Sequence, residues 1–590
     1  MRLGSLTDRL ERITHHEQVV LSVLALVAGV AVAYAAVGFR LAIGGVQWLG
    51  FGFSTEDVFS RAMLLPWWQI MAVPVAGGLI VGLLLHFLMP NQRPQGVADV
   101  IEATALNNGR MRLRTALTAA VISVTSLGAG ASTGREGPMV HLGAAIASGF
   151  SRYLRLSPAH ARTLLGCGVA SAVAASFNAP IAGVFFALEV VIGHYALSTF
   201  APVVIASVAG TVVSRIHLGA LPAFIIPEYA IVSLWEFPAF LLLGMVCALI
   251  AVIFMWSINF ATDVVDRIEV PVWLKPVAGG LAVGAVAVYF PHILGVGYEA
   301  TDAALKEQLP LWLLIALIVT KTAATATSLG CRFGGGVFSP SLFLGAMTGG
   351  AFGIIAAAAF PDLAAGHGAY AMVGMSALAA AVLGAPISTI LIVFELTSDY
   401  RMTIAVMVAT SVASVLVQQV MGGSFFHAQL RRRGLDLRGG RARHLLQALT
   451  VREVIAHDFE TIDEAAPVGH IKRKLQAMPQ VTFLVVNGGA RLVGQLSFAD
   501  LKEVAFDAGL DHLVNARDVV RGNPVVLTPD DPLEDALALM DVRGEDHLAV
   551  VDSPAHMHVV GIVHHKDVLR ALNRALLQAQ AEEHDEQRPG

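Results

Sequence analysis

Residues 134–138 of the chain read Gly-Arg-Glu-Gly-Pro and place an ionisable pair inside a long apolar stretch. A carboxylate at membrane depth is costly, so Glu136 is expected to lie on an ion or proton pathway. The two glycines predict a bend, and Pro138 suits the first turn of a helix. This short motif therefore predicts a functional loop that opens a helix within a membrane.

The composition supports a membrane setting. Of the 590 residues, 55 % are hydrophobic and only 14 % are charged, which is too apolar for a soluble globular chain. The apolar character runs from about residue 19 to about residue 420. Residues 446–590 are instead polar and acidic, with 13 Lys and Arg against 23 Asp and Glu. We therefore predict a polytopic, all-α membrane domain followed by a distinct soluble domain.

Charged residues at the two ends of the apolar region predict its orientation. Arginines precede the first apolar run and cluster after the last one, which places both termini in the cytoplasm and implies an even number of crossings. The first run has no convincing cleavage site, so it predicts a retained membrane helix after a cytoplasmic segment, residues 1–18. The three cysteines show no paired spacing and predict neither a disulfide framework nor a zinc site.

The apolar segments differ in length. Residues 19–48, 68–89, 236–261 and 310–328 predict full membrane spans. Other segments look interrupted or re-entrant, namely residues 138–150, 159–175, 180–194, 338–358 and 386–397. Broken helices are tolerated in a membrane only where their free backbone lines a cavity or packs in protein, so these segments predict an internal pathway.

The first half of the apolar region resembles the second. Ala-Pro-Ile at residues 179–181, followed by Glu189, recurs at residues 385–387, followed by Glu395. A second match joins Pro138 and residues 142–144 to Pro340 and residues 344–346. Such matches can arise by chance in apolar sequence, but their similar spacing favours a duplication. Duplicated halves with discontinuous helices are used by transporters to build a site near the midplane.

A second glycine-rich loop matches the first. Residues 334–340 read Gly-Gly-Gly-Val-Phe-Ser-Pro, again a bend with unshielded N–H groups before a proline. Helix N-termini carry partial positive charge, so two of them converging would hold a small anion without any full positive charge. The alternative is that the glycines only permit close helix packing.

Glu136 lies inside one of these anion-favouring loops. Its carboxylate can occupy the place of a bound anion and so act as a competing gate. Burial and nearby N–H groups act on its protonation in opposite directions, which favours proton exchange during a transport cycle. The alternative is a structural ion pair with Arg135.

Together, the loop at residues 134–138, the Gly-x-Phe-x-Pro loop at residues 336–340 and the two Ala-Pro-Ile segments make residues 19–434 resemble the CLC family of chloride channels and transporters. The resemblance implies a homodimer of inverted-repeat subunits, each with its own anion pathway. It implies that Glu136 is the gating glutamate and that the amides of Val337 and Phe338 donate to the central anion. Gly134, Arg135 and Gly137 are assigned to the same anion site.

Three positions depart from the best-known proton-coupled members. Gln95 replaces the serine whose hydroxyl binds the anion; its amide can still donate but is larger. Phe426 falls on the usual tyrosine and has no hydroxyl. Val190 stands where many exchangers have an inner proton-transfer glutamate, which favours a passive channel without excluding proton antiport. Glu189 is interpreted as structural.

The retained Pro138 favours chloride or a similar monovalent anion over fluoride, because fluoride-selective members of the family alter this proline.

The acidic tail contains its own repeat. Mostly apolar, β-branched runs at residues 481–486 and 547–551 predict strands between helices. The two units resemble a tandem pair of α/β CBS modules, at residues 449–508 and 515–577, with a linker at 435–448 and a polar tail at 578–590. Asp500 and Asp567 match a position that can hold an adenosine ribose. A nucleotide-free dimerisation module is the alternative, since Asp also caps a following helix.

Other classes of function have less support. Residues 130–134 fit Gly-x-Ser-x-Gly, but a nucleophile elbow needs a preceding strand, and here membrane sequence precedes it. A structural or sensory protein would not require Glu136. We therefore expect no enzyme activity, metal or required cofactor, with adenine nucleotide as a candidate ligand of the tail. The expected partners are a monovalent anion, protons, membrane lipid and a second subunit, without nucleic acid, in a prokaryotic inner or plasma membrane.

Overall fold

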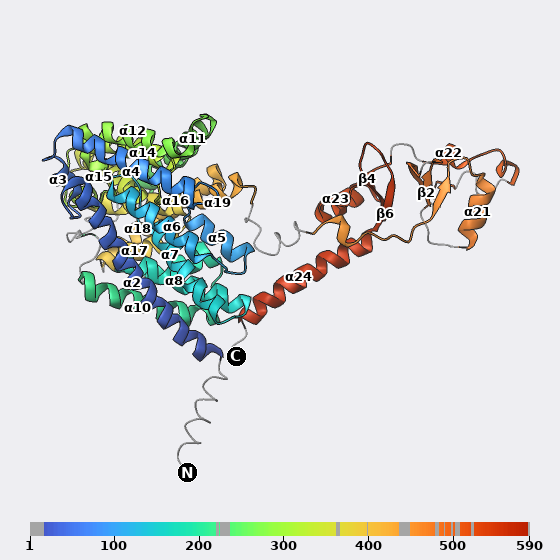
Figure 1. The fold of residues 1–590 in the computed structure, drawn as a ribbon, viewed down its shortest axis with the longest axis horizontal. Coiled ribbons are helices and arrows are strands. Elements are labelled where there is room, and N and C mark those ends of the chain that lie inside the picture. The colour runs from blue at the N-terminus through green and yellow to red at the C-terminus, as the bar shows by residue number, and fades with distance from the viewer. Residues whose placement is uncertain are drawn as a thin grey trace, which may run out of the picture. The chain divides into compact units, whose positions relative to one another are not determined.

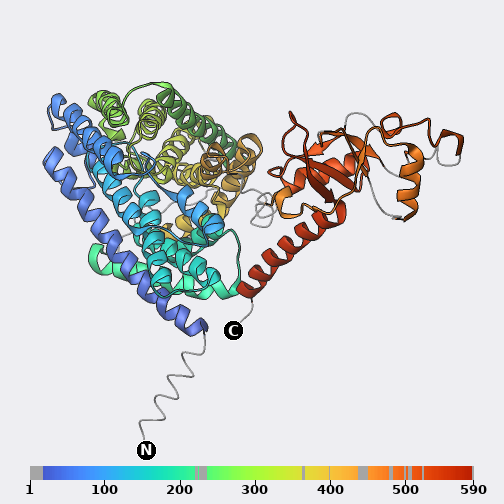
Figure 2. The same cartoon turned by 45° about the vertical axis from the view of Figure 1, so that its right-hand side comes forward.

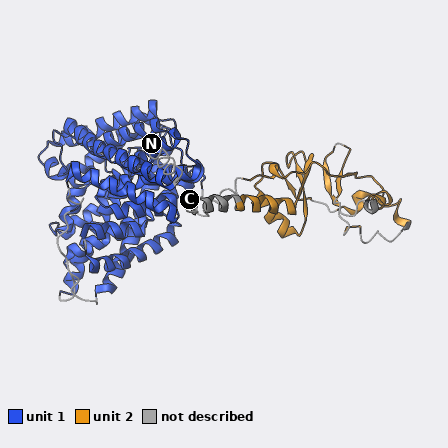
Figure 3. Ribbon diagram, turned by 90° about the horizontal axis from the view of Figure 1, so that it is seen from below, with its two compact units in different colours: residues 1–435, 586–590 blue, residues 436–585 orange. Residues whose placement is uncertain are grey.

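The protein was analysed as a computed structural model, and its chain divides into two compact units (Figure 3). One unit comprises residues 1–435 with 586–590, and the other comprises residues 436–585. The structure describes residues 17–219, 224, 236–361, 366–397, 399–435, 449–477, 483–488, 490–496, 500–501, 508–520 and 524–587. Nearly all of the predicted N-terminal segment and linker therefore lies outside the described residues.

The first unit is built from helices (Figure 1). Those of its first half are α2 (Glu17–Phe51), α3 (Val58–Ala62), α4 (Trp67–Leu88), α5 (Val97–Leu106), α6 (Leu113–Gly128), α7 (Glu136–Tyr153), α8 (Pro158–Phe177), α9 (Pro180–Phe186) and α10 (Leu197–Leu218). Those of its second half are α11 (Phe237–Arg267), α12 (Lys275–Tyr289), α13 (Tyr298–Leu305), α14 (Leu311–Gly330), α15 (Phe338–Ala359), α16 (His367–Leu383), α17 (Pro386–Thr397), α18 (Tyr400–Met421) and α19 (Phe425–Arg432).

Several of these helices can cross a membrane. Within the part of the chain that the structure describes, eight helical segments are long and apolar enough to do so. The four predicted full spans correspond to α2, α4, α11 and α14. In Figures 1 and 2, α2 runs along the edge of the unit, and side chains such as Val23 and Leu49 are exposed on it. Exposed apolar side chains on a long helix are what contact with lipid requires.

Two predicted interruptions are continuous helices, and the first, residues 159–175, lies within α8, which has 20 residues. Residues 338–358 form a continuous helix, α15, of 22 residues rather than a broken segment. The glycines there serve close packing: a Cβ at Gly345 would lie 2.3 Å from the Gly374 carbonyl oxygen, and one at Gly349 2.0 Å from that of Tyr370. Small residues let helix backbones approach within a membrane, so glycine here indicates contact with α16 rather than a break. The spans α10, α12 and α18 were not predicted.

The duplication is visible in how the helices pack. A Cβ at Gly78 of α4 would lie 2.3 Å from the Pro276 carbonyl oxygen, and one at Gly280 of α12 would lie 2.2 Å from that of Pro74. The contact between α7 and α8 likewise matches that between α15 and α16, since Gly143 approaches the backbone of Gly168 as Gly345 approaches that of Gly374. Corresponding glycines thus make corresponding contacts in the two halves.

The second unit contains two small sheets with the same connectivity. In each, the first strand is parallel to the second and the second is antiparallel to the third. The strands are β1 (Thr461–Asp463), β2 (Phe483–Val486), β3 (Leu492–Leu496), β4 (Val526–Leu527), β5 (His547–Val551) and β6 (Val559–His564). The helices are α21 (Val468–Ala477), α22 (Ala516–Val519), α23 (Leu533–Arg543) and α24 (His565–Gln587).

The two sheets share an apolar cluster that joins the halves of this unit. Leu484 and Leu492 from the first sheet pack with Ala549, Val551 and Ile562 from the second. Helix α24 continues past residue 577, so most of the predicted polar tail extends a helix rather than following it.

Candidate functional site

The two glycine-rich loops lie side by side and are hydrogen-bonded to each other. The N–H of Gly134 donates to the carbonyl oxygen of Gly336 at 2.7 Å, and the N–H of Gly336 donates to that of Gly134 at 2.8 Å. Helix α7 begins two residues after the first glycine and α15 begins two residues after the second. The structure thus brings together two helix N-termini from opposite halves of the chain.

This pairing corrects one expectation. The N–H groups of both loops were predicted to be unshielded, but those of Gly134 and Gly336 are used by the bridge, so Gly134 cannot donate this group to an anion. Among the described residues, the N–H groups of Val337 and Phe338 have no hydrogen-bond partner. Free donors at a helix N-terminus favour an anion. The N–H groups of Glu136 and Gly137 at the start of α7 have no acceptor among the described residues either, so both helix N-termini supply donors.

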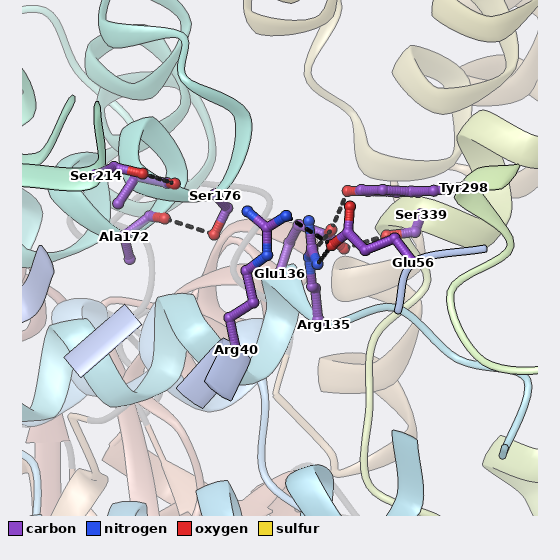
Figure 4. Close-up of polar contacts among 10 residues, drawn as sticks. Arg40, Glu56, Arg135, Glu136, Ala172, Ser176, Ser214, Tyr298 and Ser339 are labelled. Atoms are coloured by element: carbon purple, nitrogen blue, oxygen red, sulfur yellow. Dashed lines mark hydrogen bonds and ion pairs between the residues drawn. The ribbon is translucent and has the colours of Figure 1, made fainter. Parts of the chain in front are cut away.

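The Glu136 side chain is fully buried at the start of α7. The Tyr298 hydroxyl donates to its Oε1 at 2.6 Å, and the Ser339 hydroxyl donates to its Oε2 (Figure 4). The Nε of Arg135 lies 3.8 Å from Oε1. Two hydroxyl groups from the second half of the chain therefore hold the carboxylate, with a guanidinium nearby.

Arg135 has a closer carboxylate partner than Glu136. One of its guanidinium nitrogens lies 2.6 Å from an oxygen of Glu56, which Arg40 also contacts at 3.0 Å. The Arg135 guanidinium carbon also lies 4.7 Å from the centre of the Tyr298 ring, a cation–π arrangement. The Arg135–Glu136 ion pair is thus longer than the Arg135–Glu56 pair, and it is only one of several contacts that each residue makes.

A cavity of about 260 Å³ brings most of the predicted anion-site residues together. Its lining includes Gln95, Glu136, Gly137, Val337, Phe338 and Phe426. The rings of Phe186 and Phe338 lie 5.7 Å apart in its wall. We call this space the Gln95 cavity.

The lining of the Gln95 cavity carries as many carboxylates as guanidinium groups. Three arginines, Arg93, Arg332 and Arg433, line it together with the carboxylates of Asp99, Glu136 and Asp266. The aspartates are paired, since Asp99 lies 2.8 Å from Arg93 and 3.1 Å from Arg433, and Asp266 lies 2.9 Å from Arg332. A neutral Glu136 would leave one guanidinium group in excess around the cavity, which favours entry of anions.

A second cavity, of about 290 Å³, lies against the partners of Glu136. It is lined by Arg40, Glu56, Arg135 and Tyr298, among others, and we call it the Arg40 cavity. Arg135 thus lines this cavity and not the one that contains Gln95. Glu136 lines one cavity and its hydrogen-bond partner Tyr298 lines the other, so the pair separates the two spaces.

Val190 does not line the Gln95 cavity. It lies in a π-helical stretch, Ala187–Ile192, that continues α9. Such stretches are rare and were not predicted.

The neighbouring Glu189 accepts the N–H groups of Ile387 at 3.0 Å and Ser388 at 2.9 Å, at the N-terminus of α17. Its repeat counterpart Glu395 accepts those of Ile181 at 2.9 Å and Ala182 at 2.8 Å, at the N-terminus of α9. Each carboxylate thus caps the other half's helix, which fits the structural interpretation of Glu189.

Three residues that surround Glu136 and Arg135 were missed by the sequence reasoning. Ser339 is part of the quoted loop at residues 334–340, yet only its neighbours were assigned a role. Tyr298 follows a Gly-Val-Gly turn at residues 295–297, a signal that predicts a bend but not its partner. Glu56 stands in a short polar stretch between spans, where a carboxylate gives no local sign of function.

The second unit has a cavity of about 500 Å³ lined by the predicted ribose position Asp567. Arg570 and Arg574 of α24 also line it, with Glu453. Arg570 lies 3.2 Å from the Asp567 carboxylate. Asp500, in the first module, is not part of this lining.

Comparison with known proteins identifies the family. A family model described as voltage gated chloride channel matches residues 77–418, and a CBS domain model matches residues 516–574. A protein of Ralstonia nicotianae named for its likeness to the chloride channel ClcB is 36 % identical over 386 residues, covering 65 % of this chain and 90 % of that protein.

Solved structures share the fold. The crystal structure of a slow cyanobacterial Cl⁻/H⁺ antiporter superposes with a TM-score of 0.63 at 22 % identity, covering 70 % of this chain and 97 % of the other. That of a eukaryotic CLC transporter does so with a TM-score of 0.62 at 20 % identity, covering 93 % of this chain and 97 % of the other. Because the chloride-channel model matches more than half of the chain, this chain belongs to the CLC family of voltage-gated chloride channels.

Proposed function

We propose that this protein transports chloride or a similar monovalent anion across a membrane and that the Glu136 carboxylate gates the pathway. The observation that carries the proposal is the position of Glu136, buried where two helix N-termini meet and where two cavities are separated. The family membership and the named chloride channel of Ralstonia nicotianae support chloride as the anion.

The gate works by competition between two negative charges. In its ionised form, the carboxylate accepts the hydroxyls of Tyr298 and Ser339 and occupies the junction of the cavities. Protonation makes it neutral and weakens its attraction to Arg135 and to these donors. The side chain then leaves, and an anion from the Gln95 cavity takes its place.

Two modes of transport follow from this gate. Proton antiport is supported by the need of Glu136 to take up and release a proton, and by the structural similarity to proteins described as antiporters. A passive channel is the second candidate, because Val190 carries no proton at the expected inner site. Proton movement driven by a chloride gradient distinguishes them, since a passive channel moves none.

Chloride flux from proteoliposomes tests the gate itself. Wild-type flux is expected to rise as pH falls, because protonation releases Glu136. Glu136→Gln is neutral at every pH, so its flux should lose this pH dependence and any coupled proton movement. Glu307→Gln is the matched control, since Glu307 accepts the Gly368 N–H at 2.8 Å and lines neither cavity. Unchanged pH dependence in Glu136→Gln would overturn the gate.

We further propose that two copies of the chain form a homodimer with both termini in the cytoplasm. The family resemblance supports this assembly, and apolar side chains such as Ile181, Leu197 and Ile387 are exposed on the helices of both repeats. Mass measurement of the purified protein in detergent, with cysteine cross-linking, tests the dimer. Accessibility of terminal tags in sealed vesicles tests the orientation.

For the CBS region we propose a binding site for adenine nucleotide at the cavity that contains Asp567. A carboxylate able to accept ribose hydroxyls and two arginines able to bind phosphate line the same space. A rise in melting temperature on adding ATP or AMP, lost in Asp567→Ala, tests this second candidate. No shift with either nucleotide would favour a module that only dimerises.

A further inference from the structure

A group of exposed arginines lies at the end of α7 that is opposite Glu136. Residues 107–114, which lead into α6, read Asn-Asn-Gly-Arg-Met-Arg-Leu-Arg, and residues 150–157, at the end of α7, read Phe-Ser-Arg-Tyr-Leu-Arg-Leu-Ser. These two stretches contain five arginines and neither Asp nor Glu. All five arginines are exposed. We call them the arginine cluster, and its members are Arg110, Arg112, Arg114, Arg152 and Arg155.

Backbone contacts bring the two stretches of the arginine cluster together. The N–H of Met111 donates to the Ser148 hydroxyl at 2.8 Å, and that hydroxyl donates to the Gly109 carbonyl oxygen at 2.8 Å. A Cβ at Gly109, which has φ +71°, would lie 3.1 Å from the backbone of Ala161 in α8. Met111 stands between two arginines of the cluster, and Ser148 lies about one helical turn before Arg152. The loop before α6 is therefore fixed against α7 and α8, with the arginines of both stretches as neighbours.

The arginine cluster lacks carboxylate partners. Within the part of the chain that the structure describes, none of its five guanidinium groups forms an ion pair. Arg433, by contrast, lies 3.1 Å from Asp99 and 3.2 Å from Glu102. Like charges that converge without a counter-ion repel each other and attract anions from outside the protein. The cluster therefore favours an anionic partner that the chain itself does not supply in these residues.

Exposed apolar side chains continue from the arginine cluster along α6. Leu117 and Val121 are 50 % and 53 % exposed, and they follow Arg114 by three and seven residues, so all three side chains share one face of the helix. Tyr153, between two arginines of the cluster in sequence, is 86 % exposed. Tyrosine is enriched where a membrane meets water, and arginine at the end of an apolar surface extends toward lipid headgroups. The cluster thus has the surroundings expected at the level of the headgroups.

We propose that the arginine cluster binds the headgroup of an anionic phospholipid, whose acyl chains lie along the apolar face of α6 formed by Leu117 and Val121. Guanidinium groups donate paired hydrogen bonds to phosphate oxygens, and the adjacent apolar side chains suit acyl chains. A zwitterionic phospholipid offers the same chains, but its headgroup also carries a cation that the cluster repels. The bound headgroup holds α6 to the last turn of α7. This inference does not depend on the Glu136 gate or on which anion is transported.

Native mass spectrometry of the purified full-length protein, titrated with phospholipid, tests the site. The probes are phosphatidylglycerol and phosphatidylcholine with identical acyl chains, so they differ only in the headgroup. The wild type should bind phosphatidylglycerol roughly tenfold or more tightly than phosphatidylcholine. The double variant Arg114→Gln with Arg152→Gln should raise the dissociation constant of phosphatidylglycerol roughly 25-fold, about fivefold for each arginine at the membrane surface. Its dissociation constant for phosphatidylcholine should stay within about twofold of the wild-type value, since the acyl-chain contacts remain.

A matched double variant separates the cluster from the overall charge of the protein. Arg61→Gln with Arg267→Gln removes two exposed arginines, on α3 and at the end of α11, and lowers the net charge by the same amount. It should leave the dissociation constant of phosphatidylglycerol within about twofold of the wild-type value. Because all four positions are exposed, the melting temperatures of both double variants in detergent should stay close to that of the wild type. Equal weakening by the two double variants, or equal wild-type affinity for the two lipids, would overturn the inference.

Discussion

At the scale of single residues, the pathway combines a fully buried carboxylate with aromatic walls. Phe426 illustrates the difference from a pathway lined by hydroxyls, because its ring lines the Gln95 cavity but offers no donor. The N–H groups of Val337 and Phe338 and the amide of Gln95 are neutral donors in this lining. A neutral donor contributes to binding less than a charged one, which permits binding without trapping the ion.

Phe426→Tyr should strengthen chloride binding. The added hydroxyl extends into the cavity and supplies one more donor, so the dissociation constant should fall by roughly tenfold, measured by titration calorimetry. Phe425→Tyr, on the adjacent residue of α19 and in the same cavity lining, is the comparison. Equal tightening by both variants would contradict a specific role for position 426.

Lys321 is the residue that links this site to the rest of the second half. Its Nζ is fully buried and donates to the carbonyl oxygens of Ile293 and Gly295, each at 3.0 Å, in the turn that leads into Tyr298. Lys321→Met removes a costly buried charge but frees both carbonyls, so these effects on stability oppose each other.

Lys321→Met should therefore change the free energy of unfolding little, while the turn at residues 293–297 becomes less rigid. Tyr298 would then hold the ionised Glu136 less firmly, so the pH of half-maximal chloride flux from proteoliposomes should shift upward. Lys275→Met is the matched control, because Lys275 is also buried and donates to one carbonyl, that of Val265, at 2.8 Å. A larger shift from Lys275→Met would argue against the link through Tyr298.

At the scale of helices, the sequence predicted the two glycine-rich loops better than their surroundings. Glycine and proline affect the backbone of their immediate neighbours, so residues 134–138 and 334–340 could be predicted to start helices. Helices α7 and α15 begin there in the structure. The contacts of Glu136 with Tyr298 and Ser339 join residues 162 and 203 positions apart, and no local pattern specifies such pairs. The misjudged α15 has the same cause, since a glycine that breaks a helix and one that packs it look alike in sequence.

Glu189 and Glu395, which each cap a helix of the other repeat, should contribute to stability and not to transport. Each accepts two backbone N–H groups at a helix N-terminus of the other repeat, so Glu189→Ala and Glu395→Ala should each lower the free energy of unfolding by about 1–2 kcal/mol. Thermal unfolding in detergent measures this effect.

Flux per folded protein should stay unchanged in both cap variants. Lys306→Ala serves as the stability control, because it removes a partly exposed ion pair with Asp302, worth little. Abolished proton movement in Glu189→Ala, with chloride flux retained, would instead assign Glu189 to the proton pathway.

In the CBS region, His547 on β5 faces His564 on β6, with ring centres 4.7 Å apart. Burial lowers the pKa of His547 below its usual value of 6.5, and the neighbouring His564 lowers it further. The unfolded chain therefore binds a proton more readily than the folded one, so the stability of this region should fall as pH drops below about 6.5.

Hydrogen exchange in β5 and β6 of the full-length protein, compared between pH 7.5 and pH 5.5, measures this loss. His547→Gln should reduce the difference between the two pH values. His556→Gln, a change at an exposed histidine, should leave it as in the wild type. Identical acid sensitivity in His547→Gln and the wild type would exclude His547 as its source.

At the scale of the whole molecule, composition alone separated an apolar membrane region from an acidic tail. A surface in contact with lipid must be apolar, whereas a surface in contact with water is polar or charged. Repeated structure occurs in both units, as corresponding helix contacts in one and as two sheets of equal connectivity in the other. The CBS resemblance predicted the second repeat, but interior parts of its first module, such as residues 478–482 and 502–507, lie outside the described residues.

Adenine nucleotide should alter chloride flux through the full-length protein if its site in the CBS region regulates transport. We expect ATP or AMP on the side of the tail to change the flux at least twofold, a shift in the gate equilibrium of about 0.4 kcal/mol. Asp567→Ala should abolish the change while keeping the flux without nucleotide. A response retained in Asp567→Ala would place the nucleotide elsewhere.

The double hydrogen bond between Gly134 and Gly336 has a consequence for how this protein can vary. Because main-chain groups alone form the link, substitutions at neighbouring positions can change the anion ligands while the two halves stay joined. Insertion or deletion of a single residue in either loop would instead shift the register of both donors. We therefore expect the lineage of this chain to tolerate exchanged side chains around the gate and to reject changes in the length of these two loops.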